Sequence, residues 1–328
     1  MMNRRTFLCG LTLGMLSAPL AADGQPSKTV RIGYLSYSRP ADRQDLVGAF
    51  RARLRDLGHV EGQNLVIEYR YAEGRHERLP QLAADLVRLK VDVIFTYGTA
   101  ASLAVKKATA TIPIVFGIVA DPVGGGLVAT LARPGGNVTG VTTNNAELSA
   151  KRVSLLREAI PTASRVAVLS NPNFSPMSNM VADTRRAARS LGMELQVLEA
   201  REPQELAKAF AAMTAAKAHA LIVLADPMFT AERRRIVELA ASSRIPAIYT
   251  LRQTVEGGGF MSYGVDPAES FRQAAALVDK ILKGAKPADL PVEQPWRFVL
   301  AINLKTARVL GLTIPPSLLG RADQVIDP

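Results

Sequence analysis

Polar residues follow the apolar segment 93–96 at positions suited to holding a small charged molecule. Gly98 lets a ligand approach the backbone closely. Thr99 places a hydroxyl where a helix is expected to begin, an arrangement that suits a carboxylate. Threonine at such a position can also serve only as a helix cap. We therefore predict that Tyr97, Thr99 and Ala100 contact a ligand, and we keep a plain cap as the alternative role of Thr99.

Further candidates share this position, since each lies at or shortly after the end of an apolar segment. Asp121 and Asp226 can accept hydrogen bonds from an ammonium group, although Asp-Pro is also common in turns. Tyr249 and Tyr263 can supply an aromatic wall or a hydroxyl, with core or hinge packing as the alternative for Tyr263. Ligands of open α/β sheets bind beyond the carboxyl ends of the strands. The complete set of further candidates is Ser36, Asp121, Asn171, Asn173, Asp226, Tyr249 and Tyr263.

Catalytic and metal-binding patterns are missing from the sequence. The histidines His59, His76 and His219 have no spacing typical of a metal site. No G-x-S-x-G motif of a serine hydrolase occurs. Two carboxylates across a cleft can act as in glycosidases, but ammonium or hydroxyl binding explains Asp121 and Asp226 more simply. We expect no catalytic residue, no metal and no cofactor, and we keep an exported hydrolase as the least favoured alternative.

A glycine-rich stretch at 124–129 fits the loose pattern G-x-G-x-x-A. In a dinucleotide-binding fold such glycines directly follow a strand and open a helix. Here Asp121 and Pro122 separate the preceding strand from the glycines. Pro134 also limits the expected helix at 127–132 to about two turns. The stretch is therefore predicted to be a structural loop with a short helix, rather than a phosphate site.

The elements that must position these residues alternate between strands and helices. Segments with helical spacing of apolar residues, such as 46–57, 79–89 and 100–108, lie between short apolar runs. This pattern predicts a parallel sheet covered by helices on both faces. The predicted strands are 30–35, 65–69, 93–96, 114–116 and 138–142, and then 166–169, 195–198, 220–224, 247–249 and 259–262.

The second half of the chain repeats the first. Residues 30–36 parallel 164–170, and residues 111–116 parallel 244–249 at nearly the same offset. We therefore predict two doubly wound parallel-sheet lobes. The C-terminal segment is too short for a third lobe, so it must complete the first two, and the chain must cross between them several times through a hinge. The predicted limits are 28–143 plus 265–292 for lobe 1, and 144–264 plus 293–328 for lobe 2.

Residues 1–24 have the pattern of an export signal. Two arginines, Arg4 and Arg5, precede an apolar run at 7–16 that is too short to span a bilayer, and small residues follow. The arginine pair is also typical of the twin-arginine route. We predict export to the periplasm with a mature chain that begins near Gln25, and a buried N-terminal helix is the alternative. Cys9 lies in this segment, so the mature chain has no thiol.

The charge distribution argues against nucleic acid as a partner. The net charge is +11, but the basic residues are scattered apart from Arg233, Arg234 and Arg235. Aromatic residues make up only 5% of the chain, too few for a row of base-stacking platforms. We expect a monomer that binds a small molecule and no nucleic acid.

Three longer motifs, at 121–140, 282–295 and 302–316, together resemble the ABC-transporter substrate-binding family related to tryptophan- and tyrosine-type solute receptors. The resemblance covers essentially the whole mature chain. It implies a type I periplasmic binding protein that captures a small ligand, an amino acid or small carboxylate, between its lobes. It also implies delivery of the ligand to an ABC permease at the inner membrane. A sensory receptor of the same fold, docking on a chemoreceptor or sensor kinase, is the alternative.

Overall fold

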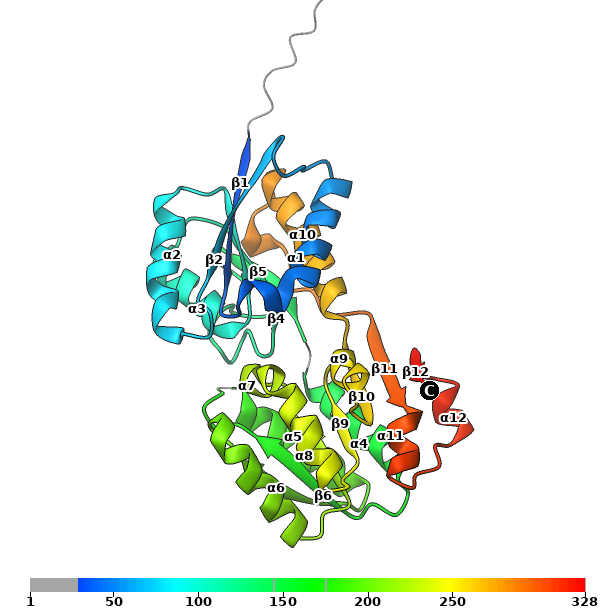
Figure 1. Cartoon of the computed structure of the whole chain (residues 1–328). Coiled ribbons are helices and arrows are strands. Elements are labelled where there is room, and N and C mark those ends of the chain that lie inside the picture. Colours follow the sequence, from blue (N-terminus) through cyan, green and yellow to red (C-terminus); the bar gives the residue numbers. More distant parts are fainter. Residues whose placement is uncertain (1–28, 144, 175, 328) are drawn as a thin grey trace, which may run out of the picture.

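The computed structural model describes residues 29–143, 145–174 and 176–327, and these form two bodies stacked end to end (Figure 1). The predicted export signal lies outside the described residues. Each body is a twisted sheet with helices on both faces. We call the body that contains the first sheet lobe 1 and the body that contains the second sheet lobe 2.

Lobe 1 is built on five parallel strands in the order β2-β1-β3-β4-β5. Its last helix, α10 (Pro267–Leu282), comes from the far end of the chain and packs beside α1 (Gln44–Asp56) (Figure 1). The strands are β1 (Val30–Ser36), β2 (Leu65–Tyr71), β3 (Val93–Tyr97), β4 (Ile114–Val119) and β5 (Val138–Thr142), and the other helices are α2 (Leu79–Arg88) and α3 (Thr99–Ala108).

Lobe 2 is built on seven strands in the order β12-β11-β10-β9-β8-β6-β7. Its strands are β6 (Arg165–Ser170), β7 (Glu194–Glu199), β8 (Ala220–Val223), β9 (Ala247–Tyr249), β10 (Met261–Val265), β11 (Phe298–Asn303) and β12 (Gln324–Ile326). Its helices are α4 (Asn145–Ala159), α5 (Met177–Ser190), α6 (Leu206–Ala215), α7 (Pro227–Ala231), α8 (Arg233–Ser242), α9 (Arg252–Glu256), α11 (Leu304–Val309) and α12 (Pro316–Leu319).

The topology accounts for the internal repeat. The orders β2-β1-β3-β4-β5 and β7-β6-β8-β9-β10 are equivalent, so the matching segments are the corresponding strands of two copies of one unit. The predicted fold class is confirmed. One departure is β11, which runs antiparallel to β10 because the chain re-enters lobe 2 at the end of the sheet nearest lobe 1. The exact limits of the lobes, 28–143 plus 265–292 and 144–264 plus 293–328, remain a prediction.

The chain passes between the lobes three times. It leaves lobe 1 between β5 and α4, returns between β10 and α10, and leaves again on the way to β11. The first and third passages are tied together, because Glu293 donates its N–H to Gly140 and accepts the N–H of Thr142, at 2.8 and 2.9 Å. These connections form the hinge region.

The glycine-rich loop differs from its prediction, because residues 127–132 form bends and irregular backbone and no helix. Three glycines around the segment, Gly126, Gly135 and Gly136, have positive φ angles that interrupt a helix. Leu127 and Val128 are buried and anchor the loop to lobe 1. The expectation of a short helix here was wrong, since the turn geometry prevails over the apolar spacing.

An ion-pair cluster fixes α10 on lobe 1. The buried carboxylate of Asp279 lies 2.9 Å from His59 Nε2 and accepts a 2.8 Å bond from Lys283 Nζ. Burial alone would raise the pKa of Asp279, but the bonds from Lys283 and His59 outweigh it and hold that pKa below its ordinary value. The ionised carboxylate of Asp279 therefore joins α10 to the loop that follows α1.

The Asp279 cluster is expected to make lobe 1 sensitive to acid. A lowered pKa stabilises the fold fully above the unfolded-state pKa of about 3.9, and this stabilisation is lost as the pH falls through the folded-state value. In urea unfolding, Asp279→Asn should therefore be less stable than the wild type at pH 6, and the difference should shrink below about pH 4. Asp183→Asn is the control, since its partner Arg186 is exposed. A difference that does not change with pH would contradict the prediction.

Candidate ligand-binding site

The carboxyl ends of β1–β5 in one sheet and of β6–β10 in the other face each other between the lobes (Figure 1). All five strands of lobe 1 are parallel, and β1 starts at the far end of the lobe and runs toward lobe 2 (Figure 1). In lobe 2, α7 and α9 follow β8 and β9 at the end nearest lobe 1 (Figure 1). We call the region between these two edges the inter-lobe site. The sequence-predicted residues lie at or next to these edges.

Thr99 is the first residue of α3, on the edge of lobe 1. The capping position is held by Gly98, whose φ of +83° few other residues adopt, and no side chain caps the helix. Thr99 is therefore not the cap, which leaves its partly exposed hydroxyl available to a ligand. Ala100 is also partly exposed beside it. The helix start provides N–H groups that favour an anion.

Aromatic rings lie beside Thr99 on the same edge. The Tyr97 ring lies below the guanidinium of Arg43, 5.0 Å from the ring centroid, and leans on Phe271. Tyr37 stacks on His76 with centroids 4.1 Å apart. Sequence reasoning missed Tyr37, Arg43 and His76, although Tyr37 carries almost the same signal as Ser36, since it is the second residue after the first predicted strand.

Ser36 and Asp121 have different surroundings on this edge. Ser36 is fully buried, and its Oγ accepts the N–H of Ser38 at 3.2 Å. Asp121 accepts the N–H of Gly124 at 2.7 Å, and any side chain on Gly124 would overlap the Asp121 carboxylate. Asp121 also accepts a 3.4 Å bond from Nδ2 of Asn179, which lies on α5 of lobe 2. Asp121 and Asn179 thus connect the two lobes directly.

Asn171 and Asp226 form one unit on the edge of lobe 2. Asn171 Nδ2 donates to Asp226 Oδ2 at 3.0 Å, and Asp226 Oδ1 accepts the N–H of Phe229 at 2.9 Å, which caps α7. Burial raises the pKa of Asp226, opposed by these hydrogen bonds. Asn173 is exposed and joins the unit through its N–H, which donates to Asn171 Oδ1 at 3.0 Å.

The charge of Asp226 reaches Tyr37 across the inter-lobe site. Burial raises the pKa of Tyr37, and the negative charges of Glu77 and then Asp226 raise it further. Asp226 belongs to lobe 2 and Tyr37 to lobe 1, so the carboxylate of one lobe acts on the phenol of the other. This pair, like Asp121 and Asn179, brings side chains distant in sequence to one site.

Tyr249 and Tyr263 occupy different depths in lobe 2. Tyr249 is only 3% exposed and packs in the core next to Gly259, and burial raises its pKa far above its ordinary value. Tyr263 is partly exposed, and its ring stacks on Phe298 with centroids 5.9 Å apart. The structure therefore leaves Tyr263 partly exposed and places Tyr249 in the core of lobe 2.

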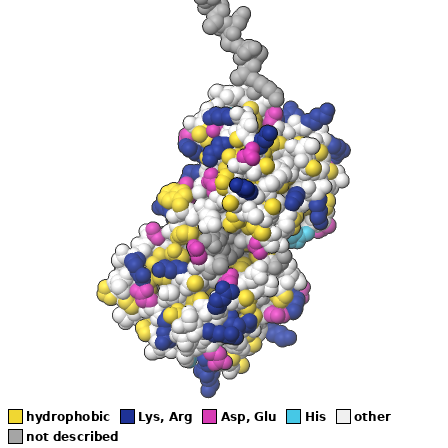
Figure 2. All heavy atoms as spheres, turned by 180° about the vertical axis from the view of Figure 1, so that it is seen from behind, with side chains coloured by type: hydrophobic (Ala, Val, Ile, Leu, Met, Phe, Trp, Pro, Cys, Tyr) yellow, Lys and Arg dark blue, Asp and Glu magenta, His cyan; other side chains and the backbone are white. Residues whose placement is uncertain are grey.

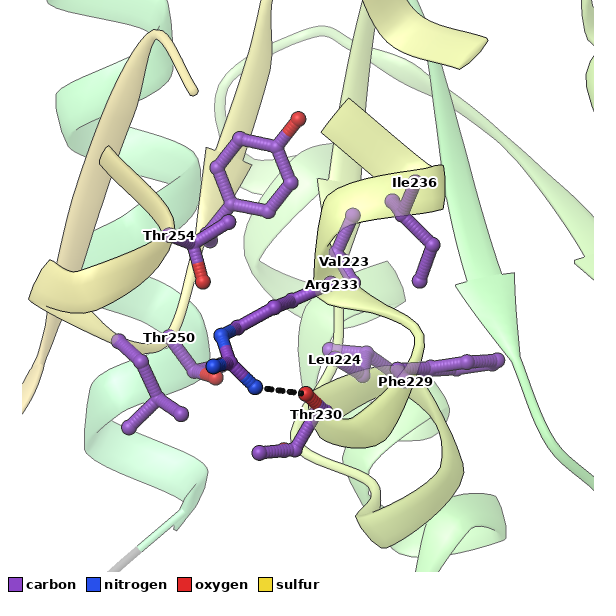
Figure 3. Close-up of a pocket in the computed structure, with 10 residues that line it drawn as sticks. Val223, Leu224, Phe229, Thr230, Arg233, Ile236, Thr250 and Thr254 are labelled. Carbon is purple, nitrogen blue, oxygen red and sulfur yellow. Dashed lines mark hydrogen bonds between the residues drawn. The ribbon is translucent and has the colours of Figure 1, made fainter. Parts of the chain in front are cut away.

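A small pocket lies at the carboxyl ends of β8 and β9, between α7, α8 and α9 (Figure 3). Its cavity volume is only about 20 Å³. Figure 3 shows Arg233 reaching between Thr230 and Thr250, and Arg233 Nη1 donates to the Thr230 carbonyl at 3.2 Å. Ligand pockets usually enclose about 300–1,000 Å³. Because this one is smaller and Arg233 enters it, we do not place the ligand here.

The described part of the chain holds no group of three or more His, Cys, Asp or Glu side chains arranged for a metal ion. Within those same residues, no helix is long and apolar enough to cross a membrane. On the face seen in Figure 2, basic and acidic side chains intermingle over both lobes.

Two similar lobes, three connections between them and polar side chains on the two facing edges define a solute-binding protein of the type I periplasmic class. The chain belongs to the family described as ABC transporter substrate binding protein, whose model matches residues 38–326. It is therefore the solute-binding component of an ABC transporter, in a family of receptors rather than enzymes.

Several relatives share most of the chain. A tyrosine-binding protein from Clostridioides difficile (strain R20291) is 26% identical over 290 residues, which cover 88% of this chain and 83% of the relative. The structure of an ABC domain from Streptococcus pneumonia in complex with L-Trp is 27% identical with a TM-score of 0.85, covering 91% of this chain and all of that one. A conserved domain protein from Vibrio cholerae is 28% identical with a TM-score of 0.84 and the same coverage.

Proposed function

We propose that this chain is an exported, monomeric receptor that captures an aromatic amino acid between its lobes and delivers it to an inner-membrane permease. The observation that carries the proposal is the pairing of hydroxyl, carboxylate and aromatic side chains on the two facing edges. Relatives that bind tyrosine and L-Trp support the aromatic class. The predicted export rests on the signal pattern of residues 1–24, and the permease follows from the family rather than from any contact in the structure.

The charged ends of an amino acid match the polar groups on the two edges. Thr99 and the N-terminus of α3 suit the carboxylate. Asp121 or Asp226 suits the ammonium group, and the rings of Tyr97 and Tyr37 suit an aromatic side chain, because aromatic pairs add stability beyond area burial. The remaining proposed contacts are Ser36, Ala100, Asn171, Asn173, Tyr249 and Tyr263. Ser36 and Tyr249 are deeply buried, so a ligand can reach them only if the neighbouring side chains move.

Calorimetry with tryptophan and tyrosine, and with leucine and glutamate as comparisons, tests this function. We expect tight binding of at least one aromatic amino acid and weaker binding of the others. Solution scattering should show a smaller radius of gyration with the ligand, because a ligand that bridges two lobes favours the closed form. Failure of every aromatic amino acid to bind the mature protein would refute the proposal.

Thr99→Val is expected to weaken binding of the preferred amino acid by about 1–3 kcal/mol, or roughly 5- to 150-fold, because one hydrogen bond is lost and a polar group is left unpaired. The melting temperature without ligand should barely change, since Thr99 caps nothing. Thr111→Val, at an exposed position beyond the other end of α3, is the matched control. Equal affinities of the two variants would remove Thr99 from the site.

A further inference from the structure

One arginine in lobe 2 is buried without a counter-ion. Arg152 lies on α4 with only 2% of its surface exposed. Its Nε donates to the Tyr263 carbonyl at 2.7 Å, while its Nη1 is buried and has no hydrogen-bond partner. Within the described chain it forms no ion pair with a carboxylate, and its one titratable neighbour with an effect on its pKa, the phenol of Tyr263, is uncharged at neutral pH. A donor of this strength is rarely left unpaired inside a protein.

The Arg152 guanidinium keeps its charge despite this burial. Burial lowers its pKa to about 10, so it remains protonated at neutral pH. A buried charge without a partner is costly unless something compensates it. Ser149 lies one turn earlier on the same face of α4, and its buried Oγ also lacks a partner. Two adjacent groups that can donate hydrogen bonds, with no acceptor between them, are suited to an anion.

This donor pair lies at the edge of the inter-lobe site. Ser262 pairs with Tyr249, the last residue of β9, so Tyr263 stands one residue beyond the end of that strand. The carbonyl that Arg152 holds is therefore at the carboxyl edge of the sheet, where α/β folds bind ligands. The chain turns into the hinge two residues later, after Val265. A small movement there can uncover the guanidinium.

We propose that Arg152, assisted by Ser149, is the counter-ion for the carboxylate of the bound solute. This inference rests on the proposed amino-acid receptor function. A carboxylate has about four acceptor sites, so it can bond to Thr99 from lobe 1 and to Arg152 from lobe 2 at once. The carboxylate then bridges the lobes and compensates the buried charge. Movement at the Tyr263 end of the hinge gives it access to Nη1.

The first experiment compares tryptophan with tryptamine, which lacks the carboxylate, on wild type and Arg152→Met. Affinity for tryptophan should fall about 10- to 100-fold, as for loss of a charge-assisted bond, while affinity for tryptamine should not change. Arg157→Met, on the next turn of α4, is the matched control, since its guanidinium is bonded to the Ala163 carbonyl. An equal loss for both ligands, or no loss, would overturn the proposal. Ser149→Ala should weaken the binding of tryptophan but not that of tryptamine. This variant provides a second test if Arg152→Met folds poorly.

The second experiment uses acetate, the carboxylate alone, and separates this inference from the proposed function. Sodium acetate should raise the melting temperature of the wild type above that in sodium chloride of equal ionic strength, and Arg152→Met should lose this difference. If no aromatic amino acid binds but the acetate effect depends on Arg152, the function fails and the anion site stands. If tryptophan binds wild type and Arg152→Met equally, the site fails and the function stands.

Discussion

Phe271→Ala is expected to destabilise lobe 1 by about 3–5 kcal/mol, the usual cost of removing a large buried aromatic side chain. Phe271 is fully buried on α10 and meets the Phe95 ring edge-on, with centroids 5.1 Å apart. Phe95 in turn stacks on Phe50 at 4.3 Å. The substitution leaves a cavity between α10 and the sheet and so weakens their packing. These two parts of lobe 1 are separated in sequence by more than a hundred residues of lobe 2. Urea unfolding measures the loss.

Phe271→Ala should also weaken ligand binding, because the ring of Tyr97 leans on Phe271 with centroids 5.6 Å apart. The control is Val309→Ala, since Val309 is 73% exposed and its truncation should change stability by less than about 0.5 kcal/mol. Hydrogen exchange should show faster opening of lobe 1 amides, with those of β6 and β8 unaffected. Faster exchange in lobe 2 instead would show that α10 does not belong to lobe 1.

Gly264→Ala is expected to cost about 1–3 kcal/mol or more, as for an overpacked interior. Gly264 lies in β10 directly before the hinge, and an added Cβ would overlap the backbone carbonyl oxygen of Thr250. A backbone atom cannot rotate away as a side chain can, so β10 itself must shift. Because β10 leads into α10, the variant should also alter the closed form and weaken binding of the solute.

Gly48→Ala is the matched control for this glycine. Gly48 lies on the exposed side of α1 with nothing near the added Cβ, so alanine should stabilise the helix by about 0.5–1 kcal/mol. The two substitutions add the same methyl group and should change stability in opposite directions. Urea unfolding and tryptophan calorimetry on both variants check this. A neutral Gly264→Ala would mean that β10 and the Thr250 loop are not in close contact.

The sequence by itself determined the two-lobe α/β fold and the places where ligand-binding residues can stand. The local spacing of apolar residues predicts the strands and helices. The repeated segments near Val30 and Arg165 indicate that one structural unit occurs twice. Ligands bind beyond the carboxyl ends of strands, so the sequence also predicts which residues stand where a ligand can bind. Thr99 and Asp226 were predicted in this way, and both lie on the facing edges.

Only the tertiary structure decided which of these side chains face the site and what they touch. Tyr249 and Tyr263 follow the same signal in the sequence, yet one is in the core and the other is partly exposed, because exposure depends on where neighbouring strands end. Partners such as Asp121 with Asn179, or Tyr37 with Asp226, come from different lobes. The buried Nη1 of Arg152, which lacks a hydrogen-bond partner, likewise leaves no trace in the sequence of α4. Local periodicity specifies an element and its buried face, but contacts between distant elements depend on register and packing, which no local pattern records.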